Sequence, residues 1–199
     1  MKMNFFIYKY MTIFISLGYD CAIAGIIEKT KWRKFSLPFD WVVSYEGVSK
    51  VFKNDFKNFV EADSNGMNDL YKIKFYHHKF PEDASQFERR VERIKNIMKN
   101  SKEEVIFIRK SHPKHGHDEY PNLSNDMTDM EELDKYLKNT YPNLKYKLIL
   151  ILDCHKCFKK TKENNTPTIK IHNISDGSKT AEDIFNIYKE TAKNPKESY

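Results

Sequence analysis

TIFISLGYDC, at residues 12–21, is the stretch of sequence that decides the fold. Residues 12–17 form a short run of β-branched and aromatic side chains, which predicts a buried strand. Gly18 ends that strand, and Asp20 is a residue type that caps helices, so a helix is predicted over residues 21–29. A buried strand that passes directly into a helix is typical of the α/β class.

Apolar patterns further along the chain predict the remaining elements. We expect three more strands, at residues 105–108, 147–152 and 168–174, and helices at 45–59, 84–100, 129–140 and 180–193. This order predicts an α/β fold in which a mostly parallel or mixed central sheet carries helices on both faces. We expect residues 1–199 to form one domain with a frayed tail at 194–199.

The composition indicates a folded protein and excludes several functional classes. Apolar residues make up 40% of the 199 residues and charged residues 31%, as in globular proteins. The net charge is +6, but the lysines are scattered, so a nucleic-acid partner is not expected. The chain has no GxGxxG or Walker motif, so no cofactor is expected. Its residue usage fits an AT-rich genome, such as that of a large DNA virus.

The number of cysteines and the first residues of the chain indicate the cellular compartment. The three cysteines, Cys21, Cys154 and Cys157, are an odd number, which argues against a disulfide framework and for a reducing, cytoplasmic setting. Residues 1–24 resemble a signal peptide, but Lys9 and Asp20 interrupt the apolar run. We therefore expect a buried first strand there, and no membrane span.

Cys21 is the best candidate for chemistry. It follows the carboxyl end of the first strand, which is where α/β sheets form their sites. In the first turn of a helix the dipole lowers a thiol pKa and favours the nucleophilic thiolate. Gly18 would let the backbone approach a substrate, and backbone N–H groups could receive an oxyanion. The alternative is that Cys21 is a small apolar core residue.

Two segments carry a resemblance to a known family. Residues 15–21 read ISLGYDC and residues 36–41 read SLPFDW, and the stretches HKF at 78–80, FERRVER at 87–93 and VIFIR at 105–109 follow in order. Together they resemble the papain-like cysteine peptidase family, a domain of unknown function found in bacteria and large DNA viruses. The resemblance covers residues 13–109.

The resemblance implies a set of catalytic residues. Cys21 would be the nucleophile and His78 the base, with the adjacent His77 as the fallback. Asp40 would orient that histidine or shape the pocket, as acyl transfer requires. Alternatives stay open, because Asp40 and Trp41 could equally fill the core. The base could also come from the second half of the chain, which carries His112, His115, His117, His155 and His172.

Further residues are candidates for binding. We expect Gly18, Trp41, Arg109 and His77 to contact substrate, with Arg109 ending a buried strand at the presumed active edge. Arg89, Arg90 and Arg93 suit a phosphate or carboxylate, or else lie on a solvated helix face with Glu88 and Glu92. Cys154-His155-Lys156-Cys157 is a possible metal or redox motif, and His112, His115, His117 and Asp118 a possible metal or base cluster. For both we favour ordinary loops, so no metal site is expected.

The leading hypothesis is a cysteine-dependent hydrolase that acts on a peptide, a protein isopeptide or a small acyl substrate. One alternative is a non-catalytic binding module in which Cys21 is structural and an aromatic pocket holds a ligand or partner protein. That pocket would comprise Phe39, Trp41, Tyr76 and Phe80. A second alternative is an esterase-like fold of the SGNH type. It is disfavoured because no histidine follows Asp176.

Overall fold

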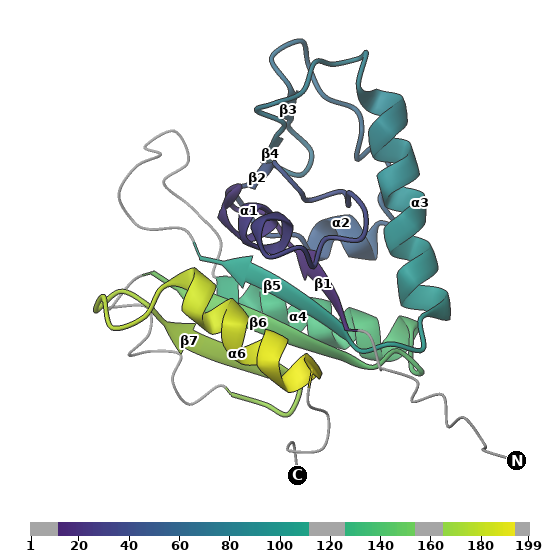
Figure 1. Cartoon of the computed structure of the whole chain (residues 1–199). Coiled ribbons are helices and arrows are strands. Elements are labelled where there is room, and N and C mark those ends of the chain that lie inside the picture. The colour runs from purple at the N-terminus through teal and green to yellow at the C-terminus, as the bar shows by residue number, and fades with distance from the viewer. Residues whose placement is uncertain (1–11, 112–125, 154–164, 194–199) are drawn as a thin grey trace, which may run out of the picture.

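A four-stranded parallel sheet forms the centre of the protein (Figure 1). The computed structural model describes residues 12–111, 126–153 and 165–193. The strand order is β1 (Ile13–Ser16), β5 (Val105–Lys110), β6 (Tyr146–Leu152) and β7 (Ile169–Asn173). Every neighbouring pair is parallel. The four predicted strands are therefore confirmed, within two residues at each end.

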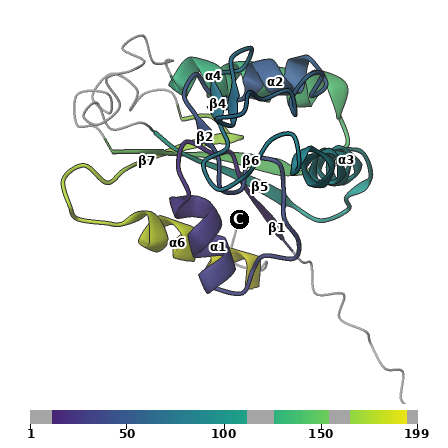
Figure 2. The same cartoon turned by 90° about the horizontal axis from the view of Figure 1, so that it is seen from above.

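Helices cover both faces of this sheet, as predicted. The helices α1 (Ala22–Lys29) and α6 (Ala181–Lys193) pack on one face, against residues such as Ile106 and Ile108 of β5. The opposite face, which includes Val105 and Phe107, shares a core with three helices. These are α2 (Ser49–Lys53), α3 (Ala84–Asn100) and α4 (Asp126–Thr140). Figure 2 shows the two layers, with α1 and α6 on one side and α2 and α4 on the other.

The alternation of side chains in β5 explains this arrangement. Successive strand residues point to opposite faces, so a continuous apolar run supplies both cores at once. Residues 105–108 are all fully buried, and so are residues 148–151 of β6. Such runs are typical of a central parallel strand, and the layered α/β prediction is confirmed.

A second, small sheet was not predicted. It has the antiparallel order β2 (Val43–Ser44), β4 (Ile73–Lys74) and β3 (Met67–Asn68). Each strand has only two residues, which is too short for an alternating pattern to stand out. The three strands lie together above α1 in Figure 1.

The predicted helix over residues 45–59 is wrong in length. Only Ser49–Lys53 is α-helical, because Asp55, Phe56 and Asn58 have φ of 50°, 60° and 61°. These left-handed values end a right-handed helix. Phe56 and Phe59 are nevertheless buried, with ring centroids 6.0 and 5.6 Å from that of Phe39. The helical spacing of the apolar residues thus predicted correctly which side chains are buried, but it predicted the wrong backbone conformation.

No helix in the described ranges is both long enough and apolar enough to cross a membrane. That residues 1–199 form one domain stays a prediction.

Candidate functional site

The turn after β1 places Cys21 at the start of α1. Gly18 and Tyr19 both have positive φ, of 73° and 89°. A Cβ on Gly18 would lie 2.8 Å from Oγ of Ser44, so glycine is needed there for space as well as for conformation. The Tyr19 N–H donates to the same Ser44 Oγ over 3.1 Å. A strained, tightly held turn of this kind is common at functional sites.

Cys21 occupies the N-cap position of α1 as a partly exposed free thiol, and its side chain makes no capping hydrogen bond. Next to it, Asp20 accepts the N–H of Ala22 at 2.8 Å and pairs with Nζ of Lys110 at 3.2 Å. Burial raises the pKa of the Cys21 thiol, and the Asp20 carboxylate raises it further. The expectation of a lowered thiol pKa is therefore wrong, because burial and the charge of Asp20 both favour the protonated form.

Asp40 stabilises its own loop. It is 5% exposed, and its Oδ2 accepts the N–H of Leu37 at 2.9 Å and lies 3.4 Å from Nη2 of Arg33. Burial raises the pKa of Asp40, while the bond from Leu37 and the charge of Arg33 oppose that rise. These contacts favour the structural alternative for Asp40. The carboxylate that the structure places against His78 is Asp83, whereas Asp40 pairs with Arg33.

Trp41 connects α1 to the histidine pair. Its φ is 63°, another left-handed value in a predicted site segment. A Cβ on Gly25 would lie 3.9 Å from Cη2 of Trp41, and Gly25 donates its N–H to the carbonyl of Cys21. On its other side, the Trp41 ring lies edge-on to His77, with centroids 6.5 Å apart. Trp41 therefore lies between the first turn of α1 and the segment that carries His77 and His78.

His78 is held on one side only. Its Nδ1 lies 3.4 Å from Oδ2 of Asp83, and its ring packs edge-on against Phe87 at 4.7 Å. Its Nε2 is buried and has no hydrogen-bond partner among the described residues. Burial and the charge of Arg90 lower the pKa of His78, against the opposing effect of Asp83. At neutral pH the ring is therefore neutral, with Nε2 as a free acceptor when Asp83 accepts from Nδ1–H.

Asp83 is not among the predicted site residues. It precedes α3 and belongs to none of the segments that carry the family resemblance. The signal that was available is its place five residues after His78, across a turn in which Asp83 accepts the N–H of Lys79 at 2.8 Å.

Arg109 is a structural residue rather than a surface one. It is 0% exposed, and its Nε donates to Asp126 over 2.7 Å. Its Nη1 donates to Ser44 Oγ at 2.7 Å and to the carbonyl of Leu17 at 3.3 Å, and its Nη2 donates to the carbonyl of Ser44 at 3.1 Å. The expectation that Arg109 contacts substrate is therefore wrong for this arrangement, because its donors are used inside the fold.

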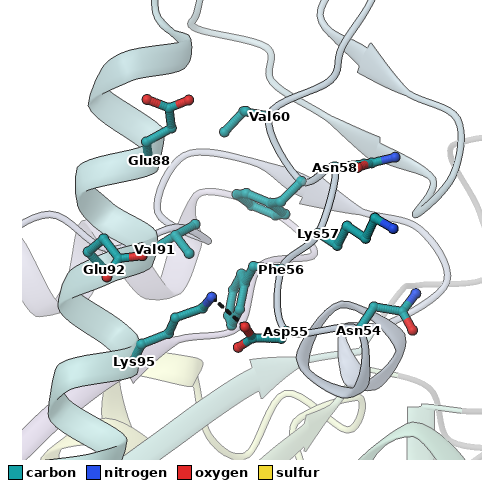
Figure 3. A pocket seen from close by; sticks show the side chains of 11 residues that line it. Asn54, Asp55, Phe56, Lys57, Asn58, Val60, Glu88, Val91, Glu92 and Lys95 are labelled. Carbon is teal, nitrogen blue, oxygen red and sulfur yellow. Dashed lines mark hydrogen bonds and ion pairs between the residues drawn. The ribbon is translucent and has the colours of Figure 1, made fainter.

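A pocket of about 550 Å³ lies elsewhere, between α3 and residues 54–60 (Figure 3). Phe56, Val60 and Val91 line its apolar part, and the ion pair between Lys95 and Asp55, at 2.8 Å, closes one end. None of the predicted site residues lines it, so it does not extend the site at Cys21.

The remaining candidates divide into two groups. Cys154, Cys157, His155 and the histidines at 112, 115 and 117 lie outside the described residues. His172 is described, and its Nε2 lies 2.7 Å from the Tyr188 hydroxyl, between β7 and α6. Within the described ranges, no three His, Cys, Asp or Glu side chains gather in a way that could hold a metal ion.

The first part of the chain carries a family signature. Residues 12–70 match the family described as "Putative papain-like cysteine peptidase". This is the family that the ISLGYDC and SLPFDW segments resemble, so that resemblance is confirmed. The match includes Cys21, Asp40 and Trp41, and it ends before His78 and Asp83.

A curated protein is also similar to part of this chain. An uncharacterised protein of Acanthamoeba polyphaga mimivirus is 46% identical over 52 residues, which is 25% of this chain and 23% of that protein. The matched stretch thus spans about a quarter of each chain. No solved structure matches the chain.

Proposed function

We propose that the chain is a cysteine-dependent hydrolase in which Cys21 is the nucleophile and His78 the general base. Asp83 orients His78 in place of the expected Asp40. The observation that carries this proposal is the state of His78, whose Nδ1 faces a carboxylate while its buried Nε2 has no described partner. Nucleophilic enzymes use this arrangement, in which an acceptor nitrogen is left free and the other nitrogen is fixed by an acid group.

The surroundings of Cys21 support the same reading. The thiol is partly exposed at the carboxyl edge of a parallel sheet, where such folds form their sites. Trp41 bridges the first turn of α1 and His77, the neighbour of His78. The segment that matches the cysteine peptidase family includes this cysteine.

The raised pKa of the Cys21 thiol determines when its proton must leave in the proposed mechanism. Because the thiol is mostly protonated at neutral pH, proton transfer must accompany attack. The sulfur bonds to the substrate carbonyl carbon as its proton passes to Nε2 of His78, and backbone N–H groups near Cys21 stabilise the oxyanion. The leaving group departs with that proton, and water then hydrolyses the thioester with His78 as base.

The family description favours a peptide or isopeptide bond as the substrate, and a small ester or amide would react by the same steps. A free thiol nucleophile needs a reducing compartment, so we place the activity in the cytoplasm.

The raised pKa of Cys21 also favours a second candidate, a non-catalytic binding module in which the cysteine is structural. In that case Trp41 and its neighbours would hold a ligand or partner protein, and His78 would have no influence on Cys21.

Acylation by p-nitrophenyl acetate separates these candidates. We expect an acetyl group on Cys21, located by peptide mass spectrometry, and at least a tenfold slower reaction in His78→Gln, from the usual size of general-base effects. His172→Gln is the matched control, because that histidine is bonded to Tyr188 beyond the site. Acylation that is absent, or equally fast in His78→Gln, contradicts the hydrolase and leaves the binding module.

A further inference from the structure

Arg90 carries a buried donor without a described partner. The residue is 7% exposed, and its Nη2 donates to Oε1 of Gln86 at 2.9 Å. Its Nη1 is buried and makes no hydrogen bond to any described residue. Buried guanidinium donors are normally paired, so an orphan of this kind calls for a ligand, an ion or a water.

Two further arginines lie close to Arg90, together with acidic side chains. Arg33 donates to Oγ of Ser36 at 2.7 Å and Arg93 donates to the carbonyl of Ser36 at 3.1 Å, so both guanidinium groups gather at the SLPFDW segment. Burial, followed by the charges of Arg33 and Arg93, lowers the pKa of Arg90, and Asp40 opposes this. Acidic groups offset part of this charge, since Arg33 also pairs with Glu28 at 2.7 Å and both Asp40 and Asp83 attract Arg90, but Nη1 of Arg90 keeps no partner among the described residues.

The unpaired donor lies close to the proposed base. The Arg90 guanidinium lies over the ring of Phe87, at 4.4 Å from its centroid, and the His78 ring lies edge-on to the same ring at 4.7 Å. Both side chains, each with a buried nitrogen that lacks a partner among the described residues, thus contact the same aromatic ring. The charge of Arg90 also lowers the pKa of His78, so an anion bound at Arg90 would lie near that ring.

We propose that Arg90 forms an oxyanion-binding subsite that holds a carboxylate of the substrate next to His78. A guanidinium pairs with carboxylate and phosphate oxygens through strong charge-assisted bonds, and burial strengthens them. The substrate would then be an acidic acyl compound, such as a peptide with an aspartate, a glutamate or a free carboxyl terminus near the scissile bond. This assignment of substrate class rests on the proposed function, whereas anion binding at Arg90 does not.

Direct binding tests the subsite without catalysis. N-acetylglutamate and inorganic phosphate are titrated separately into the Cys21→Ser protein, and binding is followed by calorimetry and by the NMR signals of the histidine rings. We expect N-acetylglutamate to bind and to shift His78 but not His172. Affinity should fall at least tenfold in Arg90→Gln and remain unchanged in Arg89→Gln, whose exposed arginine lies on the same helix.

Each alternative outcome overturns part of the proposal. Equal affinity in Arg90→Gln and the parent, or no binding of either probe at millimolar concentration, removes the subsite. Binding of phosphate alone removes the carboxylate as its occupant. If Arg90→Gln does not fold, Arg90→Lys keeps the charge without the planar fork, and unchanged affinity in that variant contradicts the proposal. These titrations use the Cys21→Ser protein, which has no thiol at this position. They can therefore succeed even if acylation of Cys21 fails, so the subsite and the hydrolase are tested separately.

Discussion

At the scale of single residues, Asp20 has two opposite effects on the reactivity of Cys21. Asp20 accepts the N–H of Ala22 and so helps to begin α1, but its charge adds to the effect of burial and raises the pKa of the thiol. The residue that positions the cysteine therefore also holds it in the protonated form. The proposed catalysis then depends on a base near the cysteine more than on a preformed thiolate.

Asp20→Asn should make Cys21 more reactive. The amide oxygen can still accept the Ala22 N–H, but the negative charge is lost, so the pKa of the thiol should fall and the thiolate fraction should rise. We expect iodoacetamide to alkylate Cys21 a few times faster at pH 7.5, measured by peptide mass spectrometry. Asp69→Asn is the control, because that carboxylate pairs with Lys72 on the surface. Alkylation that is unchanged or slower would show that Asp20 does not control the thiol.

Asp83→Asn tests the orientation of His78. An amide oxygen can still accept from Lys79, but the carboxylate that faces Nδ1 of His78 is gone. We expect acylation of Cys21 to slow by roughly 10- to 100-fold, in the range of general-base contributions. Since Asp83 raises the pKa of His78, the pH profile should also move to lower pH. A slower reaction with an unmoved profile would indicate a purely structural role.

Residue roles were the hardest feature to predict from the sequence. Cys21 could be selected because a glycine-ended strand before a helix is a local pattern. Asp83 and Arg109 could not be assigned, because their roles depend on tertiary contacts with His78 and Ser44. A buried arginine at a strand end looks the same in sequence as one that contacts substrate.

At the scale of elements, long periodic segments were predicted well and irregular ones were not. The helix predicted at 84–100 matches α3, since an apolar stripe from Phe87 to Met98 faces the core along it. The 45–59 segment failed because three left-handed residues interrupt it, and bulky residues such as Phe56 rarely adopt that conformation. The two-residue strands of the small sheet depend on pairing between distant segments, which no local pattern reports.

The β1–α1 turn gives a matched pair of glycine substitutions. Gly18 and Gly177 both have φ of 73°, but a Cβ meets Ser44 Oγ at 2.8 Å on Gly18 and nothing within 4 Å on Gly177. We expect Gly177→Ala to cost about 1 kcal/mol of unfolding free energy, because a residue with a Cβ is strained at this positive φ. Gly18→Ala should cost about 3 kcal/mol, because the steric conflict adds to the strain. Urea denaturation measures both, and equal costs would refute the close packing at Ser44.

At the scale of the whole molecule, Arg109 joins the two sheets. It extends from β5 of the large sheet to Ser44 in β2 of the small sheet, and it pairs with Asp126 at the start of α4. The same contacts fix the turn that precedes Cys21, because Ser44 also receives the N–H of Tyr19. The layered architecture could be predicted from the apolar runs, but this polar connection could not.

Removal of Arg109 should therefore weaken the entire fold. We expect Arg109→Met to lower the free energy of unfolding by about 3–5 kcal/mol, since Asp126 loses the buried charge that it faces. The double variant Arg109→Met/Asp126→Asn should recover part of that loss in urea denaturation. Arg89→Met, on the exposed side of α3, should change stability by less than about 0.5 kcal/mol. An equally small effect for Arg109→Met would contradict its central role.

The pH dependence of Cys21 acylation tests the central claim most directly. General-base catalysis needs neutral His78, and burial together with Arg90 lowers the pKa of that histidine. The rate with p-nitrophenyl acetate should therefore rise through a pKa below the ordinary histidine value and stay level through neutral pH. In His78→Gln this phase should vanish, leaving a slow reaction that follows the raised pKa of the thiol. If the native protein already shows only that slow thiol titration, His78 is not the base for Cys21.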